Sequence, residues 1–189
     1  MHAQIDSLRM KDLKQFNVPF IGLKLGKHSF DYQIDKTFFD YLDFHEFENA
    51  SLNVDLLLEK KSTLLELKFS LSGTVNVLCD VSLEPFDLEL EDSFSLVVKF
   101  GEEFNDDNDE ILILPHEEYQ INVAQHIYEL IVLAVPSKKV HPKVLDGTLK
   151  SDAIKKLKEL EIKKENTTDK DSVDPRWDKL KNLITEKKT

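Results

Sequence analysis

Apolar and polar residues alternate along a long stretch in the middle of the chain, from Leu65 to Cys79. Its odd positions are apolar or glycine, and its even positions from Glu66 to Asn76 are polar. Successive side chains leave a strand on opposite sides, so this period of two predicts a strand with one buried face and one wet face. Gly73 in its middle predicts a bend or bulge, where the strand passes between two parts of a curled sheet.

Further alternating runs lie on both sides of this stretch. Residues 12–34 predict an opening hairpin with its turn around Gly26. Residues 52–58 predict the strand before the central one, and 86–100 predict either one bent strand or two short strands after it. A short apolar strand is predicted for residues 111–114. Four or more consecutive strands with short turns predict a curled antiparallel sheet or a partly open β-barrel.

Two segments of the same region show helical spacing. A short helix is predicted for residues 35–42, with Asp35 as its N-cap. A longer one is predicted for residues 123–135, capped by Asn122 and ended by Pro136, with one apolar stripe that packs on the sheet. The predicted fold class is therefore α+β, a sheet with one packed helix and a helical C-terminal tail.

The character of the chain changes after residue 136. Residues 1–136 form the predicted β-rich body, and 137–189 form a basic, partly flexible tail. A charged, weakly amphipathic helix is predicted for residues 154–161. Asp174 followed by Pro175 predicts the start of a final helix, because proline is favoured at the first helical position after an N-cap.

Charge divides in the same way as the predicted structure. The tail carries 15 Lys or Arg against 10 Asp or Glu, a net charge of +5, which leaves −16 on the body of a chain whose total is −11. Phosphate binding requires clustered cations, so any RNA contact is expected on the tail or on local basic patches. The acidic body either keeps the protein in solution or faces a basic partner.

Composition and motifs limit the classes of function. A single cysteine fits a reducing compartment, and neither an apolar run of membrane-crossing length nor a signal sequence is present, so we expect a cytoplasmic protein with no membrane contact. The sequence lacks a phosphate loop, a dinucleotide fingerprint, a zinc-binding helix motif and a nucleophile elbow. We therefore expect no enzymatic activity and no cofactor.

Three groups of residues are candidates for chemistry. Cys79 falls at the buried parity of its strand beside Asp80, whose charge would raise the pKa of the thiol, so a structural role is expected. The acidic stretch 101–110 lacks the glycine and the bidentate glutamate of a calcium loop. A metal site built from His116, His126 and His141 has no supporting ligand spacing, and we expect no metal. An enzyme is therefore the alternative that the sequence supports least.

Three stretches, in this order, resemble the YceD family of large ribosomal RNA subunit accumulation proteins. They are residues 78–86, residues 109–115 with the helix that follows, and residues 173–183. The positions that match the family's motifs are Cys79, Leu83, Asp174, Pro175, Arg176 and Leu180. Val81 and Ser82 stand where many relatives have arginine and a second cysteine, and the downstream cysteines are absent. Residues 136–142 resemble a branch of the family that has a basic segment here.

The resemblance implies a noncatalytic role in the accumulation of 23S rRNA, and hence in synthesis or processing of the large ribosomal subunit. For the mechanism, we hypothesise that basic residues of the tail contact rRNA or a large-subunit precursor, and that the acidic body faces a basic ribosomal protein. The candidate RNA-binding residues are Lys138, Lys139, His141, Lys143, Arg176, Lys179 and Lys181. Asp174 and Arg176 alternatively only cap and dock the last helix. The competing hypothesis is a protein interaction module whose acidic body binds a basic partner and no RNA.

Overall fold

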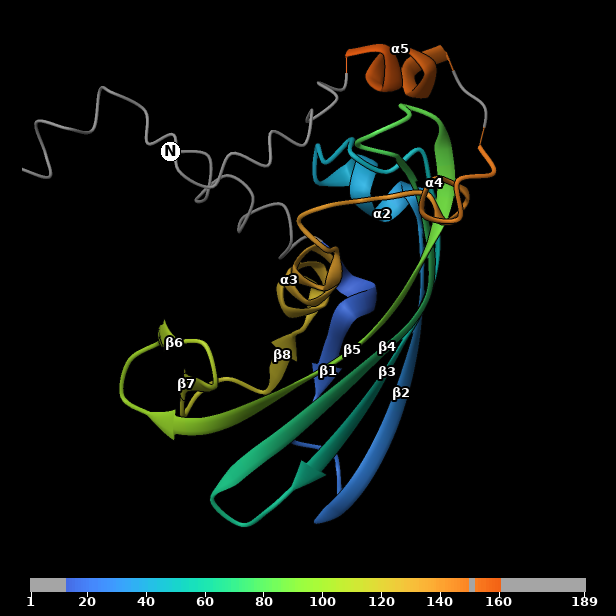
Figure 1. The fold of residues 1–189 in the computed structure, drawn as a ribbon. Helices are drawn as coiled ribbons and strands as arrows, with labels where there is room; N and C mark the ends of the chain where they lie inside the picture. The colour runs from blue at the N-terminus through green and yellow to red at the C-terminus, as the bar shows by residue number, and fades with distance from the viewer. Residues whose placement is uncertain (1–12, 150–151, 161–189) are drawn as a thin grey trace, which may run out of the picture.

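An open six-stranded sheet forms the centre of the molecule (Figure 1), in a computed structural model that describes residues 13–149 and 152–160. In spatial order its strands are β2 (Gly26–Asp35), β3 (Asn49–Lys60), β4 (Leu64–Leu78), β5 (Pro85–Gly101), β7 (Ile111–Pro115) and β6 (Asn105–Asn108). A second sheet pairs β1 (Asn17–Pro19) with β8 (Gln120–Asn122). The helical elements are η1 (Lys14–Phe16), α2 (Lys36–Tyr41), α3 (Ala124–Ala134), α4 (Pro142–Leu145) and α5 (Asp152–Leu160). The α+β class is confirmed, but the sheet does not close into a barrel.

Strand β4 is the central strand that the alternating pattern predicted. It pairs antiparallel with β3 on one side and along its whole length with β5 on the other. The apolar odd positions are buried, and Leu67, Phe69 and Val77 have no exposed surface. Figure 1 shows α3 lying across one side of the long strands, so the buried parity of β4 faces this layer. The core therefore lies between the sheet and α3.

Gly73 allows strands β3 and β4 to approach each other closely, and it does not mark a bulge. The β3–β4 register runs through the Leu52–Gly73 pair without a shift. Gly73 has a φ of +136°, and a Cβ atom placed on it would lie 2.3 Å from the backbone oxygen of Ser51. Only glycine adopts this backbone conformation and leaves that space free. Of the two alternatives predicted for Gly73, a bend or a bulge, the bulge is wrong, because the register is unshifted. The need for glycine at this position has a clear steric cause.

The predicted hairpin over residues 12–34 is wrong in its first half. Strand β2 forms as predicted, but residues 17–19 pair with 120–122, about a hundred positions along the chain, and residues 20–25 form no strand. The ammonium group of Lys60 explains the loop, because it donates hydrogen bonds to the backbone oxygens of Phe20 at 2.8 Å and Leu23 at 2.9 Å. These carbonyls are satisfied by a side chain in place of a strand partner.

Strand β5 is one continuous strand, which decides between the two alternatives for residues 86–100. Its charged interruption at residues 91–93 stays paired with β4. The end of β5 pairs with β7 in parallel, so the sheet is not wholly antiparallel. This arrangement follows from the β6–β7 hairpin, whose second strand returns alongside β5 and whose first strand forms the sheet edge.

The helices of the body begin within one residue of their predicted starts. The side chain of Asp35, the N-cap of α2, accepts a hydrogen bond from the N–H of Thr37. The N-cap of α3 is Val123, one residue after the predicted Asn122, although the N–H of Ala124 donates to the side-chain oxygen of Asn122 at 3.0 Å. Helix α5 confirms the helix predicted near residues 154–161, and the final helix predicted from Asp174 lies outside the described residues. In the described ranges, no helix has the length and apolar character needed to cross a membrane.

Candidate functional site

The loop that follows β4 is a compact turn between residues 79 and 84. The N–H of Cys79 donates to the backbone oxygen of Glu84, and the N–H of Leu83 donates to the backbone oxygen of Cys79, both at 2.9 Å. Leu83 has a φ of +60° and is 70% exposed. A large apolar residue is uncommon in this left-handed region, so the turn holds Leu83 in a strained conformation facing solvent.

The thiol of Cys79 lies at the buried base of this loop. Its sulfur accepts hydrogen bonds from the backbone N–H of Ser82 at 3.4 Å and of His141 at 3.3 Å. Burial raises the pKa of the Cys79 thiol, but hydrogen bonds from the His141 N–H and from the side chain and N–H of Ser82 outweigh it and lower this pKa to about 7. The expectation of a raised pKa at Cys79 is wrong, because the hydrogen bonds donated to its sulfur lower this pKa below its usual value. Cys79 itself is fully buried, as a structural cysteine is expected to be.

The first part of the tail docks on this loop. The N–H of Asp80 donates to the backbone oxygen of Lys139 at 2.8 Å, and the N–H of Lys139 donates to the carboxylate of Asp80 at 2.6 Å. The ring of His141 packs against Phe86 with 5.2 Å between centroids, and its Nδ1 accepts the N–H of Lys143 as the cap of α4. We call residues 138–143 the basic segment.

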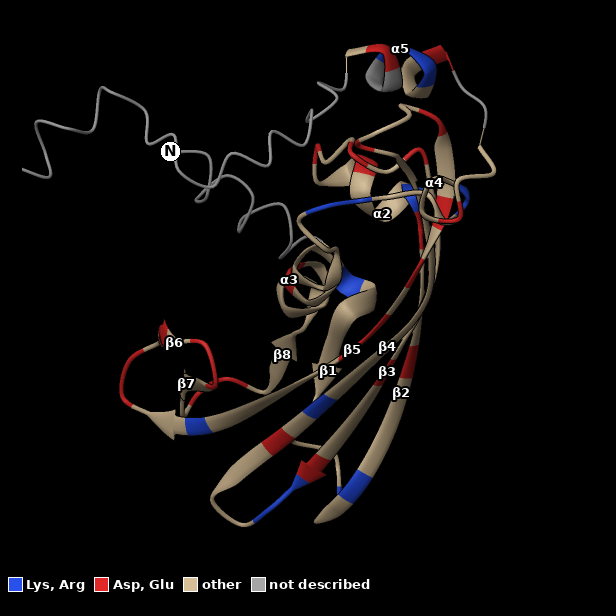
Figure 2. Cartoon of the chain, in the orientation of Figure 1, with Lys and Arg blue, Asp and Glu red and all other residues tan. Residues whose placement is uncertain are grey.

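The ammonium groups of the basic segment differ in their surroundings. The Nζ atom of Lys139 lies 3.8 Å from the Glu46 carboxylate and is half-buried. Lys138 and Lys143 are exposed, and neither pairs with a carboxylate among the residues described. Figure 2 shows the basic stretch as a blue section of chain between α3 and α4. The structure thus brings four of the predicted residues together: Lys138, Lys139, His141 and Lys143. Of these, Lys139 and His141 are docking residues, because they have partners on the body.

The other predicted residues lie outside the described part of the chain. They are Arg176, Lys179 and Lys181 of the RNA-binding candidates, and Asp174, Pro175 and Leu180 of the family motif. The three histidines weighed as metal ligands have separate aromatic neighbours: His116 stacks on Phe100, His126 on Phe69, and His141 packs on Phe86. The described residues hold no group of three or more His, Cys, Asp or Glu arranged to bind a metal ion.

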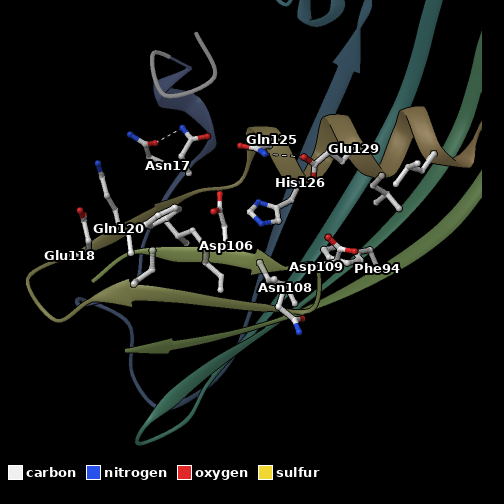
Figure 3. Close-up of a pocket in the computed structure, with 18 of the residues that line it drawn as sticks. Asn17, Phe94, Asp106, Asn108, Asp109, Glu118, Gln120, Gln125, His126 and Glu129 are labelled. Atoms are coloured by element: carbon white, nitrogen blue, oxygen red, sulfur yellow. Dashed lines mark hydrogen bonds between the residues drawn. The ribbon is translucent and has the colours of Figure 1, made fainter. Parts of the chain in front are cut away.

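A groove that sequence reasoning missed lies at the other end of the sheet. It has a volume of about 710 Å³, and its walls come from α3, the middle of β5, the β6–β7 hairpin, β8 and Asn17. Figure 3 shows residues from these elements pointing into one space. The acidic stretch 101–110 was the one sign of this groove in the sequence. The groove itself forms because α3 packs opposite that stretch, and no local sequence pattern indicates this packing.

Comparison with known proteins identifies a family. The family model described as "Large ribosomal RNA subunit accumulation protein YceD" matches residues 67–184. No curated protein and no solved structure matches the chain significantly. The matched span starts in β4 and includes the Cys79 loop, α3, the basic segment and the three motif positions from Asp174 to Arg176. Because this span is more than half of the 189 residues, the chain belongs to the YceD family.

Proposed function

We propose that this protein is a noncatalytic cytoplasmic factor that promotes accumulation of 23S rRNA and synthesis or processing of the large ribosomal subunit. Membership of a family named for accumulation of the large ribosomal RNA supports a role in ribosome biogenesis. The proposal extends to particular residues through the docked basic segment, whose backbone is fixed by hydrogen bonds. The segment presents Lys138 and Lys143 exposed and without a carboxylate partner among the described residues.

The proposed contact is electrostatic. Lys138 and Lys143 bind phosphate groups of rRNA or of a precursor particle, and release the counterions condensed there. Hydrogen bonds between the Cys79 loop and the basic segment fix the backbone of the segment in advance, which lowers the entropy cost of ordering it on the RNA. Lys139 and His141 act as docking residues, and Arg176, Lys179 and Lys181 supply a second group of cations in the same tail.

The acidic body has a separate proposed partner. With a net charge of −16 over residues 1–136, it repels phosphate and is suited to a basic ribosomal protein. A second candidate function, a protein interaction module that binds a basic partner and no RNA, is favoured by the carboxylates that line the groove. The two candidates differ in whether the basic segment is needed for association with the particle.

Sedimentation of the tagged protein from cell lysate through sucrose gradients separates these candidates. At low salt, the wild type is expected to travel with large-subunit precursors, and it should leave them at high salt. The variant K138E/K143E removes about two phosphate contacts, so the slope of log affinity against log salt should fall by about 1.4–1.8.

A matched variant controls for the change of net charge. Lys24 and Lys27 are exposed and lie before and at the start of β2, away from the basic segment. The variant K24E/K27E should sediment as the wild type does. If K138E/K143E also travels with the particles at every salt concentration, the proposed RNA contact is wrong. Protein that stays at the top of both gradients would exclude stable particle binding altogether.

A further inference from the structure

The groove beside α3 combines an apolar floor with an acidic lining. Buried side chains form part of its floor: Leu96, Leu112, Leu114, Ile121 and Leu130. Carboxylates from several different elements line it: Asp92, Asp106, Asp109, Glu118 and Glu129. No lysine or arginine occurs among the described residues that line it. Figure 2 shows the same concentration of negative charge as a red section around β6.

The carboxylates of the groove have few partners within the protein. Glu129 accepts a hydrogen bond from the side chain of Gln125 at 2.9 Å, and Asp92 accepts the N–H of Ser93. The side chains of Asp106, Asp109 and Glu118 accept no hydrogen bond from the rest of the described chain. Their charge is therefore available to a cation brought by a ligand.

His126 provides an independent sign of an incomplete site. Figure 3 shows its imidazole pointing from α3 into the groove toward Asp106. Its Nδ1 atom is buried and lacks a hydrogen-bond partner among the described residues. Burial lowers the pKa of His126 to about 4, against the opposing effect of Asp106, so the ring is neutral at pH 7 and supplies no counter-charge to the carboxylates. Buried polar groups without partners are rare in native proteins and call for a physical explanation.

Exposed apolar side chains also line the groove. Leu133 on α3 is 80% exposed, and Phe104, just before β6, is 55% exposed. A lone metal ion or a polyamine gains little from such residues, whereas a peptide with apolar side chains buries them. The described residues also form no cluster able to hold a metal ion. The carboxylates equally oppose binding of RNA.

We propose that this groove binds a lysine- and arginine-rich peptide segment of a protein partner, with apolar side chains on the floor and cationic ones over the carboxylates. The charge complementarity and the exposed Leu133 and Phe104 carry this inference. A volume of about 710 Å³ takes a few side chains of such a segment. The inference rests on the proposed function only in the choice of a basic partner. It leaves the RNA contact of Lys138 and Lys143 testable separately, because β6 and α4 lie far apart, on the left and on the right in Figure 1.

The direct test is fluorescence anisotropy of full-length protein with a labelled synthetic peptide of about twelve residues, in which Lys and Arg alternate with Leu. Neutralising the groove with D106N/D109N/E118Q should raise the Kd about tenfold, because each exposed ion pair contributes about twofold to threefold. The matched control is D31N/D55N/E89Q, which removes the same charge from exposed positions outside the groove and should change the Kd less than twofold.

A second pair of variants tests the apolar part of the proposal. F104A/L133A should raise the Kd about fivefold, and the control L25A/L145A, which truncates exposed leucines elsewhere, should leave it unchanged. All of these side chains are exposed, and unchanged thermal unfolding would show that the fold is retained. A Kd that is equal for wild type and D106N/D109N/E118Q would overturn the proposal. An equal rise in the Kd of the charge control D31N/D55N/E89Q would also overturn it. Binding of spermidine together with an unchanged Kd for F104A/L133A would overturn it as well, because it would assign the groove to a polyamine.

Discussion

His126, a half-buried residue whose Nδ1 atom is fully buried, should make the protein lose stability in mild acid. Burial lowers the pKa of His126 from 6.5 to about 4. In the unfolded chain this histidine takes up a proton as the pH falls below 6.5, while the folded protein resists protonation until about pH 4. The unfolded state therefore binds more protons in this window, and stability falls as the pH falls. The contribution is fully present above pH 6.5 and is lost by about pH 4.

The size of this effect follows from the shift in pKa. One unit corresponds to about 1.4 kcal/mol, so the full shift corresponds to about 3 kcal/mol, and about 2 kcal/mol of it is lost by about pH 5. This is a large fraction of the stability of a typical domain, which is about 5–15 kcal/mol. Among the charged groups of the groove, Asp106 is the one that acts against the shift.

Urea unfolding of the wild type and of His126→Phe, each at about pH 7.5 and about pH 5, measures this contribution. Phenylalanine keeps the stacking on Phe69 and Phe94 and removes the titrating group. All other ionisable groups are common to both proteins, so the wild type should lose about 2 kcal/mol more than the variant between the two pH values. His126→Leu guards against overpacking by the larger ring. Equal losses in wild type and both variants would refute the reasoning.

Three further substitutions test the fold and the docking of the tail. Gly73→Ala should lower the free energy of unfolding by about 3 kcal/mol in urea titrations, because its Cβ would meet the backbone oxygen of Ser51; a loss below about 1 kcal/mol would contradict the steric argument. Leu83→Gly should raise the free energy of unfolding by about 1 kcal/mol by relieving a left-handed conformation, and a lower value would show that Leu83 packs usefully. Cys79→Ala removes the acceptor of the His141 N–H, so hydrogen exchange at that amide should accelerate; an unchanged rate would mean that the sulfur does not hold the segment.

The parts of the fold that the sequence predicted are those with local periodicity. The alternation from Leu65 to Cys79 predicted β4 and its buried face, and the cap residues Asp35 and Asn122 marked the starts of two helices. The register of these elements follows from short connections between sequential strands.

The parts that could not be predicted depend on contacts between distant positions. Strand β1 pairs with β8, about a hundred positions away, and β5 pairs with β7 in parallel after the chain has made the β6–β7 hairpin. The groove arises because α3 lies opposite the acidic stretch, and no spacing in the sequence records that packing. The docking of the basic segment on Cys79 and Asp80 was missed for the same reason, although both partners were noted separately.

The ratio of 23S to 16S rRNA, measured in cells that lack the chromosomal gene and carry it on a plasmid, tests the proposed role in ribosome biogenesis. The deletion should lower the ratio, and the wild type and K24E/K27E should restore it. K138E/K143E should restore it only in part, although it is folded and present at the same level. A ratio that the deletion leaves unchanged would contradict the role in 23S rRNA accumulation. Full restoration by K138E/K143E would contradict the assignment of that role to the basic segment.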